Sequence, residues 1–351
     1  MRLVHAALGA GASGPVLRVP SRGKQTAAAA AQGPTASSIW SMARRATLCG
    51  AGAGAALLVG EMLYVRAKFR LPPDARGPLA GVEQPTAVSS AAAGRGWLRS
   101  ADPPPRQLNI VFLGDSLVTG VGCSAEASEA RGPVLPRRVA ELLAQQLGAS
   151  VAWSCVGETG ADVSMLRTRL LPILQSEIKR VAASGEGQRV DAVIVMTGLN
   201  DIKECLLFAN PRLHPWRFGE LMESLLCSVH EMAGSPSTLL VAGCPIEAVP
   251  RFNDLWPMSA ATRAITRLWE DQKRRAAEAA HARELATGTA GGKIAFVAPP
   301  PSLVQRLLDG VPYFSSDGMH PNDAGYVVWA ELLASELLAT WKVSGLPPAA
   351  A

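Results

Sequence analysis

The sequence predicts an α/β fold, because short apolar runs alternate along the chain with longer segments whose apolar residues recur at helical spacing. The runs are rich in branched residues and too short for helices, which is typical of buried strands. Strands joined through helices run parallel, and such a sheet needs helices on both faces. We therefore expect a three-layer α/β/α sandwich with a mainly parallel, five-stranded sheet. It should be one domain over residues 108–342, a length sufficient for one well-buried core.

The elements of this domain follow one another in a regular order. The predicted strands lie at 108–113, 151–155, 190–196, 239–242 and 294–297, and the predicted helices at 135–147, 163–178, 218–232, 260–285 and 324–341. Local signals support several boundaries: Gly148 ends the first helix, Pro172 interrupts the second, and Pro321-Asn-Asp opens the last.

The first 45 residues are basic and contain no acidic residue among many Ala, Ser, Gly and Thr. This composition is typical of an organelle transit peptide, and a disordered tail is the open alternative. Residues 46–65 are apolar except for Glu61 and are long enough for a candidate transmembrane anchor, with a cleaved targeting segment as the alternative. We therefore expect a membrane-associated protein, in a chloroplast or mitochondrion if the leader is a transit peptide. Basic residues flank the anchor on both sides and do not orient it.

Two further segments lack the strand–helix pattern. Residues 66–107 are rich in Pro and Gly and predict a tether without regular structure between the anchor and the folded domain. Residues 343–351 predict a disordered tail.

Charge is distributed unevenly. Residues 1–100 hold twelve Lys and Arg against three acidic residues, whereas the remainder holds 22 against 26. The basic balance therefore belongs to the leader, and the domain has no basic stripe of the kind that binds nucleic acid. The six cysteines are scattered, with no Cys or His pair at metal-ligand spacing, so we expect free thiols and no metal site.

A serine follows the first predicted strand. Leu108–Leu113 is stopped by Gly114, and Asp115 and Ser116 come next. Residues at the carboxyl end of a strand lie at the edge where open α/β sheets bind their ligands. Gly-Asp-Ser is also good turn chemistry, so the tripeptide alone fits an ordinary strand-to-loop turn equally well.

Three further stretches supply the remaining parts of a serine-hydrolase site. They are 154–162 with Gly157 and Gly160, Gly198-Leu-Asn-Asp201 after the third strand, and Asp317-Gly-Met-His320 before the last helix. In this order the four stretches resemble the SGNH, or GDSL, hydrolase family, over residues 106–342, and in particular its single-domain, bacterial-type lysophospholipase and thioesterase branch. The resemblance implies a flavodoxin-like sandwich, in agreement with the strand–helix pattern.

A serine nucleophile needs a base and a group that orients this base. Asp317 precedes His320 by three residues, so one loop can direct the carboxylate to one ring nitrogen while the other nitrogen faces Ser116. The family's Asp-x-x-His arrangement implies the same roles. His214 is the only other histidine close to a motif.

The resemblance also implies an oxyanion hole made by the Ser116 backbone N–H, a glycine N–H and the Asn200 side chain. We expect the glycine to be Gly160, because Thr159-Gly-Ala-Asp stands where the family has its glycine before a helix. The family often has Asn near position 154, where this chain has Ser154, so Gly157 stays open. We expect Asp115 to cap the turn and Asp201 to fix the Asn200 loop through backbone hydrogen bonds.

Together these features predict a serine esterase that hydrolyses a carboxylic ester through an acyl-enzyme, without metal or organic cofactor. Lysophospholipids and acyl-thioesters are among the substrates that the resemblance implies. An acyltransferase or a carbohydrate acetylesterase would use the same residues, and an inactive binding module is the alternative from another class. We expect a monomer by default.

Large apolar side chains follow the third and fourth predicted strands. We expect Phe252 and Trp256 to line a short acyl site, with packing of Phe208, Phe252 and Trp256 against the core as the alternative.

Overall fold

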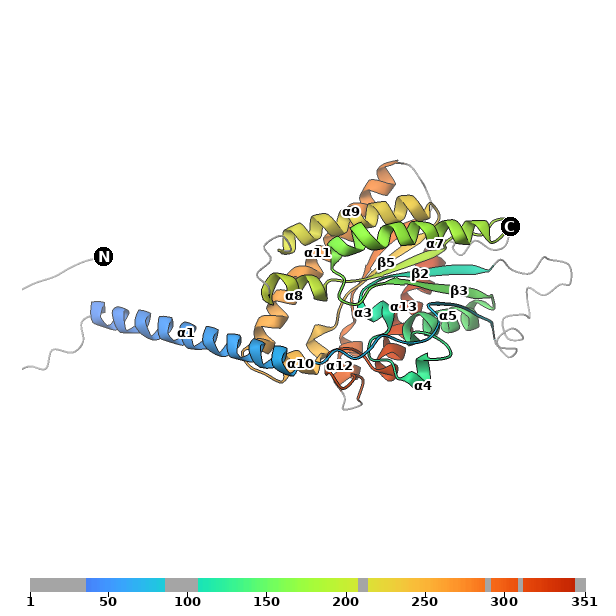
Figure 1. Cartoon of the computed structure of the whole chain (residues 1–351). Coiled ribbons are helices and arrows are strands. Elements are labelled where there is room, and N and C mark those ends of the chain that lie inside the picture. Colours follow the sequence, from blue (N-terminus) through green and yellow to red (C-terminus); the bar gives the residue numbers. More distant parts are fainter. Residues whose placement is uncertain (1–35, 86–106, 208–213, 288–291, 309–311, 345–351) are drawn as a thin grey trace, which may run out of the picture. The chain divides into compact units, whose positions relative to one another are not determined.

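The computed structural model describes residues 36–85, 107–207, 214–287, 292–308 and 312–344. Most of the predicted leader, the tether segment 86–106, Phe208 and the tail segment 345–351 lie outside the described residues. The chain divides into two units, residues 1–52 and 53–351. Helix α1 (Ala36–Lys68) belongs to both units (Figure 1). Its residues 36–52 are all that the structure describes of the first unit, and its residues 53–68 are the start of the second.

The second unit contains a six-stranded sheet with the order β1-β3-β2-β4-β5-β6. The strands are β1 (Ala80–Glu83), β2 (Leu108–Gly114), β3 (Val151–Gly157), β4 (Ala192–Met196), β5 (Thr238–Ala242) and β6 (Lys293–Val297). Strands β2 to β6 are parallel and correspond to the five predicted strands. The mainly parallel sheet is therefore confirmed.

The sixth strand, β1, corrects two predictions: the sheet does not have five strands, and the segment 66–107 does not lack regular structure. Strand β1 pairs antiparallel with β3, with Ala80 opposite Ser154 and Glu83 opposite Val151. Its sequence, Ala-Gly-Val-Glu, has neither an apolar run nor strong strand propensity. Backbone pairing with the free edge of β3 makes this segment a strand, and such pairing leaves no signal in the local sequence.

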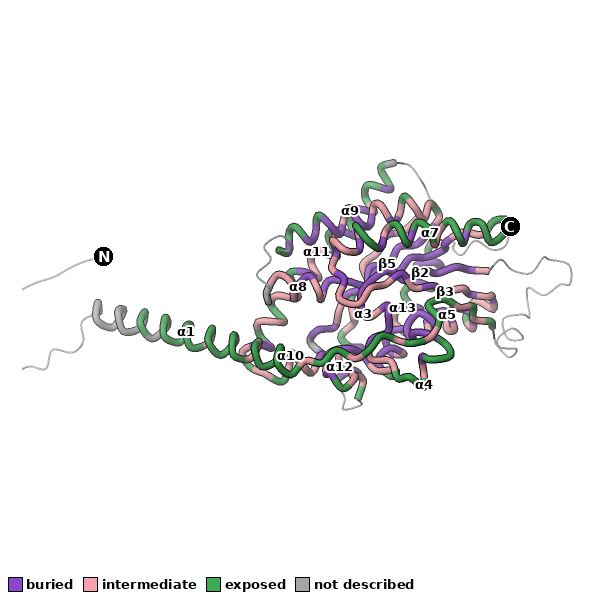
Figure 2. The backbone as a smooth tube through the Cα atoms, in the orientation of Figure 1, coloured by how far each residue is buried: buried purple, intermediate pink, exposed green. Residues whose placement is uncertain are grey.

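Helices cover both faces of the sheet. Helices α5 (Val134–Leu147) and α13 (Asp323–Ser344) pack on one face, and α7 (Leu171–Ala183), α9 (Pro215–Ala233) and α11 (Met258–Thr287) on the other (Figure 1). Side chains of β2 alternate between the two cores: Ile110 and Phe112 face α5 and α13, whereas Val111 and Leu113 face the other layer. In this three-layer sandwich β2, β4 and β5 are buried along their whole length, whereas the edge strand β1 is partly exposed (Figure 2). Because α13 continues to Ser344, the first two residues of the predicted tail are helical.

Several short helices lie between these elements. They are α3 (Ser116–Thr119), α4 (Ala125–Ser128), α6 (Val163–Met165), α8 (Leu199–Leu207), α10 (Pro250–Asn253) and α12 (Pro301–Leu308), with a 3₁₀ turn at Ile246–Ala248. The predicted helix 163–178 contains a π-helical turn, Leu166–Leu170, just before Pro172, whose missing N–H cannot continue the helical ladder. Helix α8 begins at Leu199, so Asn200 and Asp201 lie in its first turn.

Candidate active site

Ser116 lies at the carboxyl end of the central strand β2, as the first residue of α3. The strand ends at Gly114, where an added Cβ would come 2.2 Å from the Met196 carbonyl oxygen, so only glycine fits between β2 and β4. The Asp115 side chain accepts from the Leu117 N–H at 3.1 Å and caps α3, as predicted. Ser116 is therefore held on a sharp strand-to-helix turn with 8% of its surface exposed.

The structure brings Ser116, His320 and Asp317 together in one hydrogen-bonded row. His320 Nε2 lies 2.9 Å from Ser116 Oγ, and His320 Nδ1 lies 2.6 Å from Asp317 Oδ2. The other carboxylate oxygen, Asp317 Oδ1, accepts from Ser315 Oγ at 2.7 Å and from the backbone N–H groups of Met319 and His320. The 315–320 loop therefore fixes its own aspartate and presents the histidine to the serine.

Hydrogen bonds decide the charge of Asp317. Burial by itself would raise the pKa of this carboxyl group, but the bonds from His320, from two backbone N–H groups and from Ser315 outweigh burial and lower the pKa to about 2. Asp317 is therefore ionised at neutral pH and favours the His320 tautomer with its hydrogen on Nδ1. That tautomer leaves Nε2 free to accept the Ser116 hydroxyl hydrogen.

Arg251 supports the same loop from outside. Its guanidinium donates twice to the Asp317 carbonyl oxygen, at 2.9 and 2.7 Å, and its backbone N–H donates to the Gly318 carbonyl oxygen. Gly318 has a φ of +67°, a left-handed conformation that glycine adopts without strain. No spacing in the sequence indicated that Arg251 would reach this loop.

The predicted oxyanion residue Asn200 lies beside the serine turn. Asn200 Nδ2 donates to Ala161 O at 3.1 Å and to Asp115 Oδ2 at 3.3 Å, so its amide lies between the glycine loop and the serine turn. The Ser116 N–H belongs to the first turn of α3, where backbone N–H groups have no partner within the helix.

The two candidate glycines have different surroundings. Gly157 ends β3 opposite Gly114, and an added Cβ would come 3.0 Å from a Val118 methyl group. Gly160 lies in the following loop with a φ of +87°, and no atom lies within 4 Å of an added Cβ. Space is open where a side chain would stand at Gly160, whereas Val118 and Thr119 fill that space at Gly157. Gly160 as the oxyanion donor stays a prediction, with Gly157 as the alternative.

Asp201 differs from its expected role. Its carboxylate accepts from the Val163 N–H at 3.1 and 3.3 Å, so it fixes the start of α6 and not the Asn200 loop itself. Burial raises the pKa of Asp201 to about 7, and the nearby carboxylates of Asp162 and Asp115 act in the same direction. Burial also raises the pKa of Asp115. The signal for this role is absent from the sequence because Val163 stands 38 residues away.

The remaining predicted residues lie farther from the row. His214 caps α9, where its Nδ1 accepts from the Arg217 N–H at 3.2 Å, so it is not placed as a competing base. Phe252 lies half-buried in α10, and Trp256 is 73% exposed. A narrow cavity lies beside the serine turn, and its walls include Leu117, Met196, Leu199, Cys244 and Trp329. Neither Phe252 nor Trp256 lines this cavity. The acyl-site role of Phe252 and Trp256 stays a prediction.

Two charged residues near the site had no signal in the sequence. Lys273 of α11 is buried, donates to Glu270 Oε1 at 2.7 Å, and comes so close to Gly198 that a Cβ there would lie 2.7 Å from Lys273 Cε. Asp74, from the predicted tether, contacts the hydroxyl groups of Thr119 and Thr159. Among the described residues no group of His, Cys, Asp and Glu is placed to hold a metal ion.

A serine, a histidine and a carboxylate in one row at the carboxyl edge of a parallel sheet define a hydrolase-type site on an α/β/α sandwich. The model of the GDSL-like lipase/acylhydrolase family matches residues 112–328, more than half of the chain, and the chain belongs to this family. It is accordingly an ester-hydrolysing enzyme.

Solved structures with a similar fold include Axe2, an acetylxylan esterase from Geobacillus stearothermophilus. It is 16% identical, with 66% of this chain and 94% of that chain covered and a TM-score of 0.44. The lipase Lip_vut3 from a goat rumen metagenome is 15% identical, with 65% and 96% covered and a TM-score of 0.44. A comparison with curated protein sequences finds no match.

Proposed function

We propose that the enzyme hydrolyses a carboxylic ester through a covalent acyl-enzyme on Ser116, with His320 as the base and Asp317 as the group that orients and stabilises it. The row Ser116 Oγ, His320 Nε2, His320 Nδ1, Asp317 Oδ2 carries this proposal, because its two contacts of 2.9 and 2.6 Å are those of an activated serine.

In the first half of the reaction, Ser116 Oγ attacks the ester carbonyl carbon while its hydrogen passes to His320 Nε2. The imidazolium that forms is stabilised by the Asp317 carboxylate. When the tetrahedral intermediate collapses, the C–O bond to the alcohol breaks and His320 returns the proton to the leaving alkoxide. In the second half, water attacks the acyl carbon while one of its protons passes to His320 Nε2. When this second intermediate collapses, the bond between the acyl carbon and Ser116 Oγ breaks, His320 returns the proton to Ser116 Oγ, and the acid is released.

The charge that develops on the carbonyl oxygen needs donors that are already in place. The N–H groups of Ser116 and Gly160 and the Asn200 amide would supply them. In the free enzyme Asn200 donates to Ala161 O at 3.1 Å and to Asp115 at 3.3 Å. The longer of these two hydrogen bonds is the one that an oxyanion can replace, and Lys203, which donates to Asn200 Oδ1 at 3.0 Å, keeps the amide oriented.

Labelling by a fluorophosphonate tests the nucleophile. The full-length protein should be labelled at Ser116, and Ser116→Ala should lose both labelling and hydrolysis of a short-chain p-nitrophenyl ester while its thermal unfolding stays unchanged. Labelling at another serine, with Ser116 unmodified, would overturn the assignment. Product analysis with an added alcohol separates hydrolysis from acyl transfer to that alcohol.

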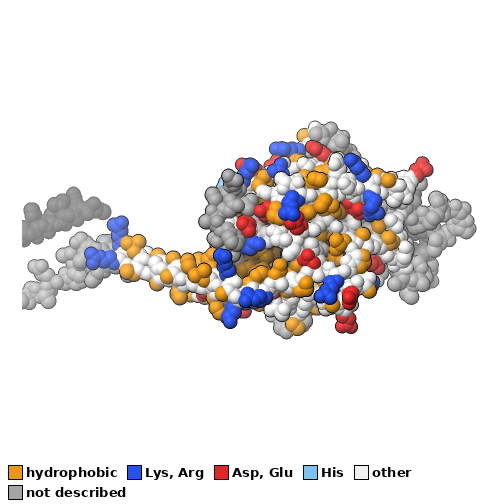
Figure 3. Space-filling view, in the orientation of Figure 1, with side chains coloured by type: hydrophobic (Ala, Val, Ile, Leu, Met, Phe, Trp, Pro, Cys, Tyr) orange, Lys and Arg blue, Asp and Glu red, His pale blue; other side chains and the backbone are white. Residues whose placement is uncertain are grey.

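We further propose that the substrate is an ester of a lipid, such as a lysophospholipid, reached from a membrane surface. Thr47–Lys68 of α1 is long and apolar enough to cross a membrane, and none of it is buried. Figure 3 shows apolar side chains along this helix, and basic residues stand at 44, 45, 66 and 68. The length and composition of this helix support a membrane anchor. A cleaved targeting segment would have the same length and composition and is the alternative.

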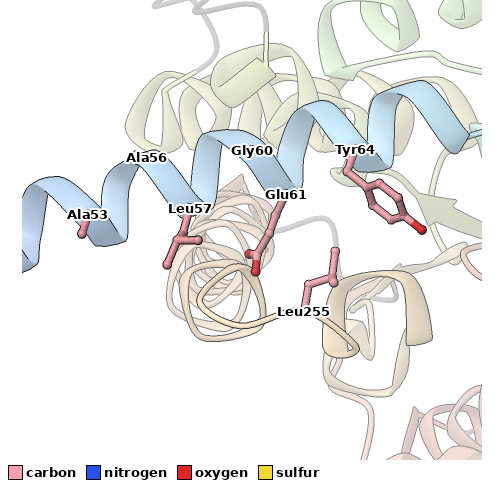
Figure 4. A pocket seen from close by; sticks show the side chains of 7 residues that line it. All are labelled: Ala53, Ala56, Leu57, Gly60, Glu61, Tyr64 and Leu255. Carbon is pink, nitrogen blue, oxygen red and sulfur yellow. The ribbon is translucent and has the colours of Figure 1, made fainter.

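Glu61 interrupts this apolar stretch and would be costly in the middle of a bilayer. Its carboxylate accepts from the Met258 N–H, at the start of α11, at 2.8 Å. Leu57, Glu61 and Tyr64 lie on the side of α1 that faces Leu255 (Figure 4). This hydrogen bond gives the carboxylate a partner and so lowers the cost of Glu61 in the second half of the apolar stretch.

The short connection to the site supports a substrate from the membrane. Asp74, which contacts the catalytic loops, stands six residues after Lys68, and six residues reach at most about 20 Å when fully extended. If α1 lies in a membrane, the catalytic edge of the sheet is therefore close to that membrane. A soluble acyl-thioester or acetylated sugar would gain nothing from this position.

A change of linker length tests the lipid substrate. Twenty Gly and Ser residues inserted after Phe69 in the full-length chain should lower hydrolysis of a lysophospholipid in vesicles and leave hydrolysis of a soluble acetate ester unchanged. Equal rates on vesicles with and without the insert would refute this proposal and leave the serine mechanism intact. From the composition of residues 1–45 we also propose that the protein is directed to a chloroplast or mitochondrion. The location of a fluorescent protein fused to these residues tests this proposal.

A further inference from the structure

The segment between α1 and β1 contacts the catalytic edge of the sheet at Asp74. Its Oδ1 atom accepts from Thr119 Oγ1 at 2.9 Å and is also hydrogen-bonded to Thr159 Oγ1, and the two threonine hydroxyl groups are 2.6 Å apart. The neighbouring Ala75 N–H donates to the Thr119 carbonyl oxygen at 3.1 Å. Three residues on, a Cβ at Gly77 would come 2.0 Å from the Ser128 carbonyl oxygen, so this part of the chain lies directly against the domain.

The two threonines belong to the two loops that form the proposed active site. Thr119 is the last residue of α3, and its hydroxyl also lies 3.3 Å from the Ser116 carbonyl oxygen. Thr159 immediately precedes Gly160, the proposed oxyanion donor. Asp74 therefore connects the loop of the nucleophile to the loop of the glycine through a single carboxylate oxygen.

Other contacts also support the glycine loop. The Ala161 N–H donates to the Glu158 carbonyl oxygen at 3.0 Å, and on the far side Asn200 binds Ala161 O and Asp201 binds the Val163 N–H. At Gly160 no atom lies within 4 Å of an added Cβ, so no side chain packs on that side of the turn. Thr159 precedes Gly160 in this turn, and its hydroxyl ties the turn to Asp74.

A carboxylate suits this position for a simple reason. Each threonine hydroxyl carries one hydrogen, whereas an ionised carboxylate only accepts. Because the two threonine hydroxyl groups lie 2.6 Å apart, one of them donates to the other and the remaining hydrogen goes to Asp74, which completes one hydrogen-bonded cluster. Asparagine at this position would keep one accepting oxygen without the charge, and alanine would keep none.

We propose that Asp74 is a positioning residue of the esterase, which holds the Thr159–Gly160 backbone so that the Gly160 N–H points to the developing oxyanion. The proposal rests on the proposed serine mechanism and adds to it a residue from a segment outside the family match. Asp74 acts through Thr159 and does not touch the substrate. Its effect is on the rate of the chemical step and not on substrate binding.

The test compares Asp74→Ala, Asp74→Asn and the control Glu83→Gln in the full-length protein with a soluble acetate ester. Glu83 lies in the same N-terminal segment and accepts from Trp153 Nε1 on β3, away from Ser116. Asp74→Ala should lower kcat about tenfold with little change in KM, because a misplaced oxyanion donor slows the chemical step. Asp74→Asn should recover part of the loss, and Glu83→Gln should match the wild type.

A double-mutant cycle with Thr159→Val sharpens the test. If Asp74 acts through Thr159, the double variant should be no slower than the slower single variant, because both changes remove the same interaction. The proposal is overturned if the two effects multiply, if Asp74→Ala raises KM and leaves kcat unchanged, or if the lost activity equals the lost folded fraction. An inactive wild-type enzyme would instead refute the proposed function, so the two failures are distinguishable.

Discussion

The two halves of the proposed active site are built in different ways. The half with the base is local: Asp317, its hydrogen-bond donors Ser315 and Met319, and His320 all lie within six consecutive residues. The half with the oxyanion donors is assembled from distant segments, with contacts from Asp201 to Val163 and from Asn200 to Asp115. A short motif determines the geometry of the local half, whereas the geometry of the assembled half depends on the sheet that brings its segments together.

The largest expected effect falls on the local half. Asp317→Asn should lower kcat by about 10⁴-fold, because the amide no longer stabilises the imidazolium and favours the wrong tautomer. Kinetics with a soluble short-chain ester measure this loss. Ser315→Ala is the matched control, since it removes one of several hydrogen bonds to the same carboxylate and should cost only a few-fold. A loss below tenfold for Asp317→Asn would show that the orienting group lies elsewhere.

The next effect falls on the assembled half. Asn200→Ala should lower kcat by about 10²–10³-fold, or roughly 3–4 kcal/mol, through loss of one oxyanion donor, with KM nearly unchanged. Lys203→Met keeps the donor and removes only one of the contacts that orient it, so its effect should be much smaller. If the two variants are equally slow, the amide acts as part of the loop structure and not as a donor.

A third experiment separates stability from catalysis within the assembled half. Burial raises the pKa of Asp201 from its ordinary value near 4 to about 7, so the folded state holds a proton that the unfolded state releases between these values. The contribution of Asp201 to the free energy of unfolding is therefore fully present below pH 4. It decreases as the pH rises to 7, by up to about 4 kcal/mol.

Asp201→Asn should remove this dependence, because the amide oxygen can still accept from the Val163 N–H and has no proton to lose. Urea unfolding at pH 4.5 and pH 8 measures the difference between wild type and variant. Relative to the wild type, the free energy of unfolding of Asp201→Asn should be higher at pH 8 than at pH 4.5. Asp254→Asn, which removes an exposed carboxylate, is the control, and parallel curves for wild type and Asp201→Asn would contradict the assignment.

The smallest effect concerns the acyl chain. Trp256→Ala should raise KM for octanoate esters much more than for acetate esters if Trp256 contacts the acyl chain, since each buried methylene is worth about 1 kcal/mol. Trp216, 63% exposed in α9, provides the control Trp216→Ala. Equal changes for both ester lengths would favour a role of Trp256 in packing its loop.

The sequence by itself determined the fold class, because the burial of strand and helix faces imposes a periodicity that can be read along the chain. It also indicated Ser116, Asp317 and His320, since a strand end and a three-residue spacing are local features. The order of the four motifs pointed to the family before any geometry was known.

Only the tertiary structure decided how the rest of the site is supported. Strand β1 forms because a free edge of β3 accepts it, and Asp74 reaches Thr119 and Thr159 because that strand and the segment before it lie along the domain. The partner of Asp201, the burial of Lys273 and the reach of Arg251 likewise depend on residues tens of positions away. A hydrogen bond between distant residues leaves no period and no spacing in the sequence, because its two ends meet only when the sheet and its helices have packed.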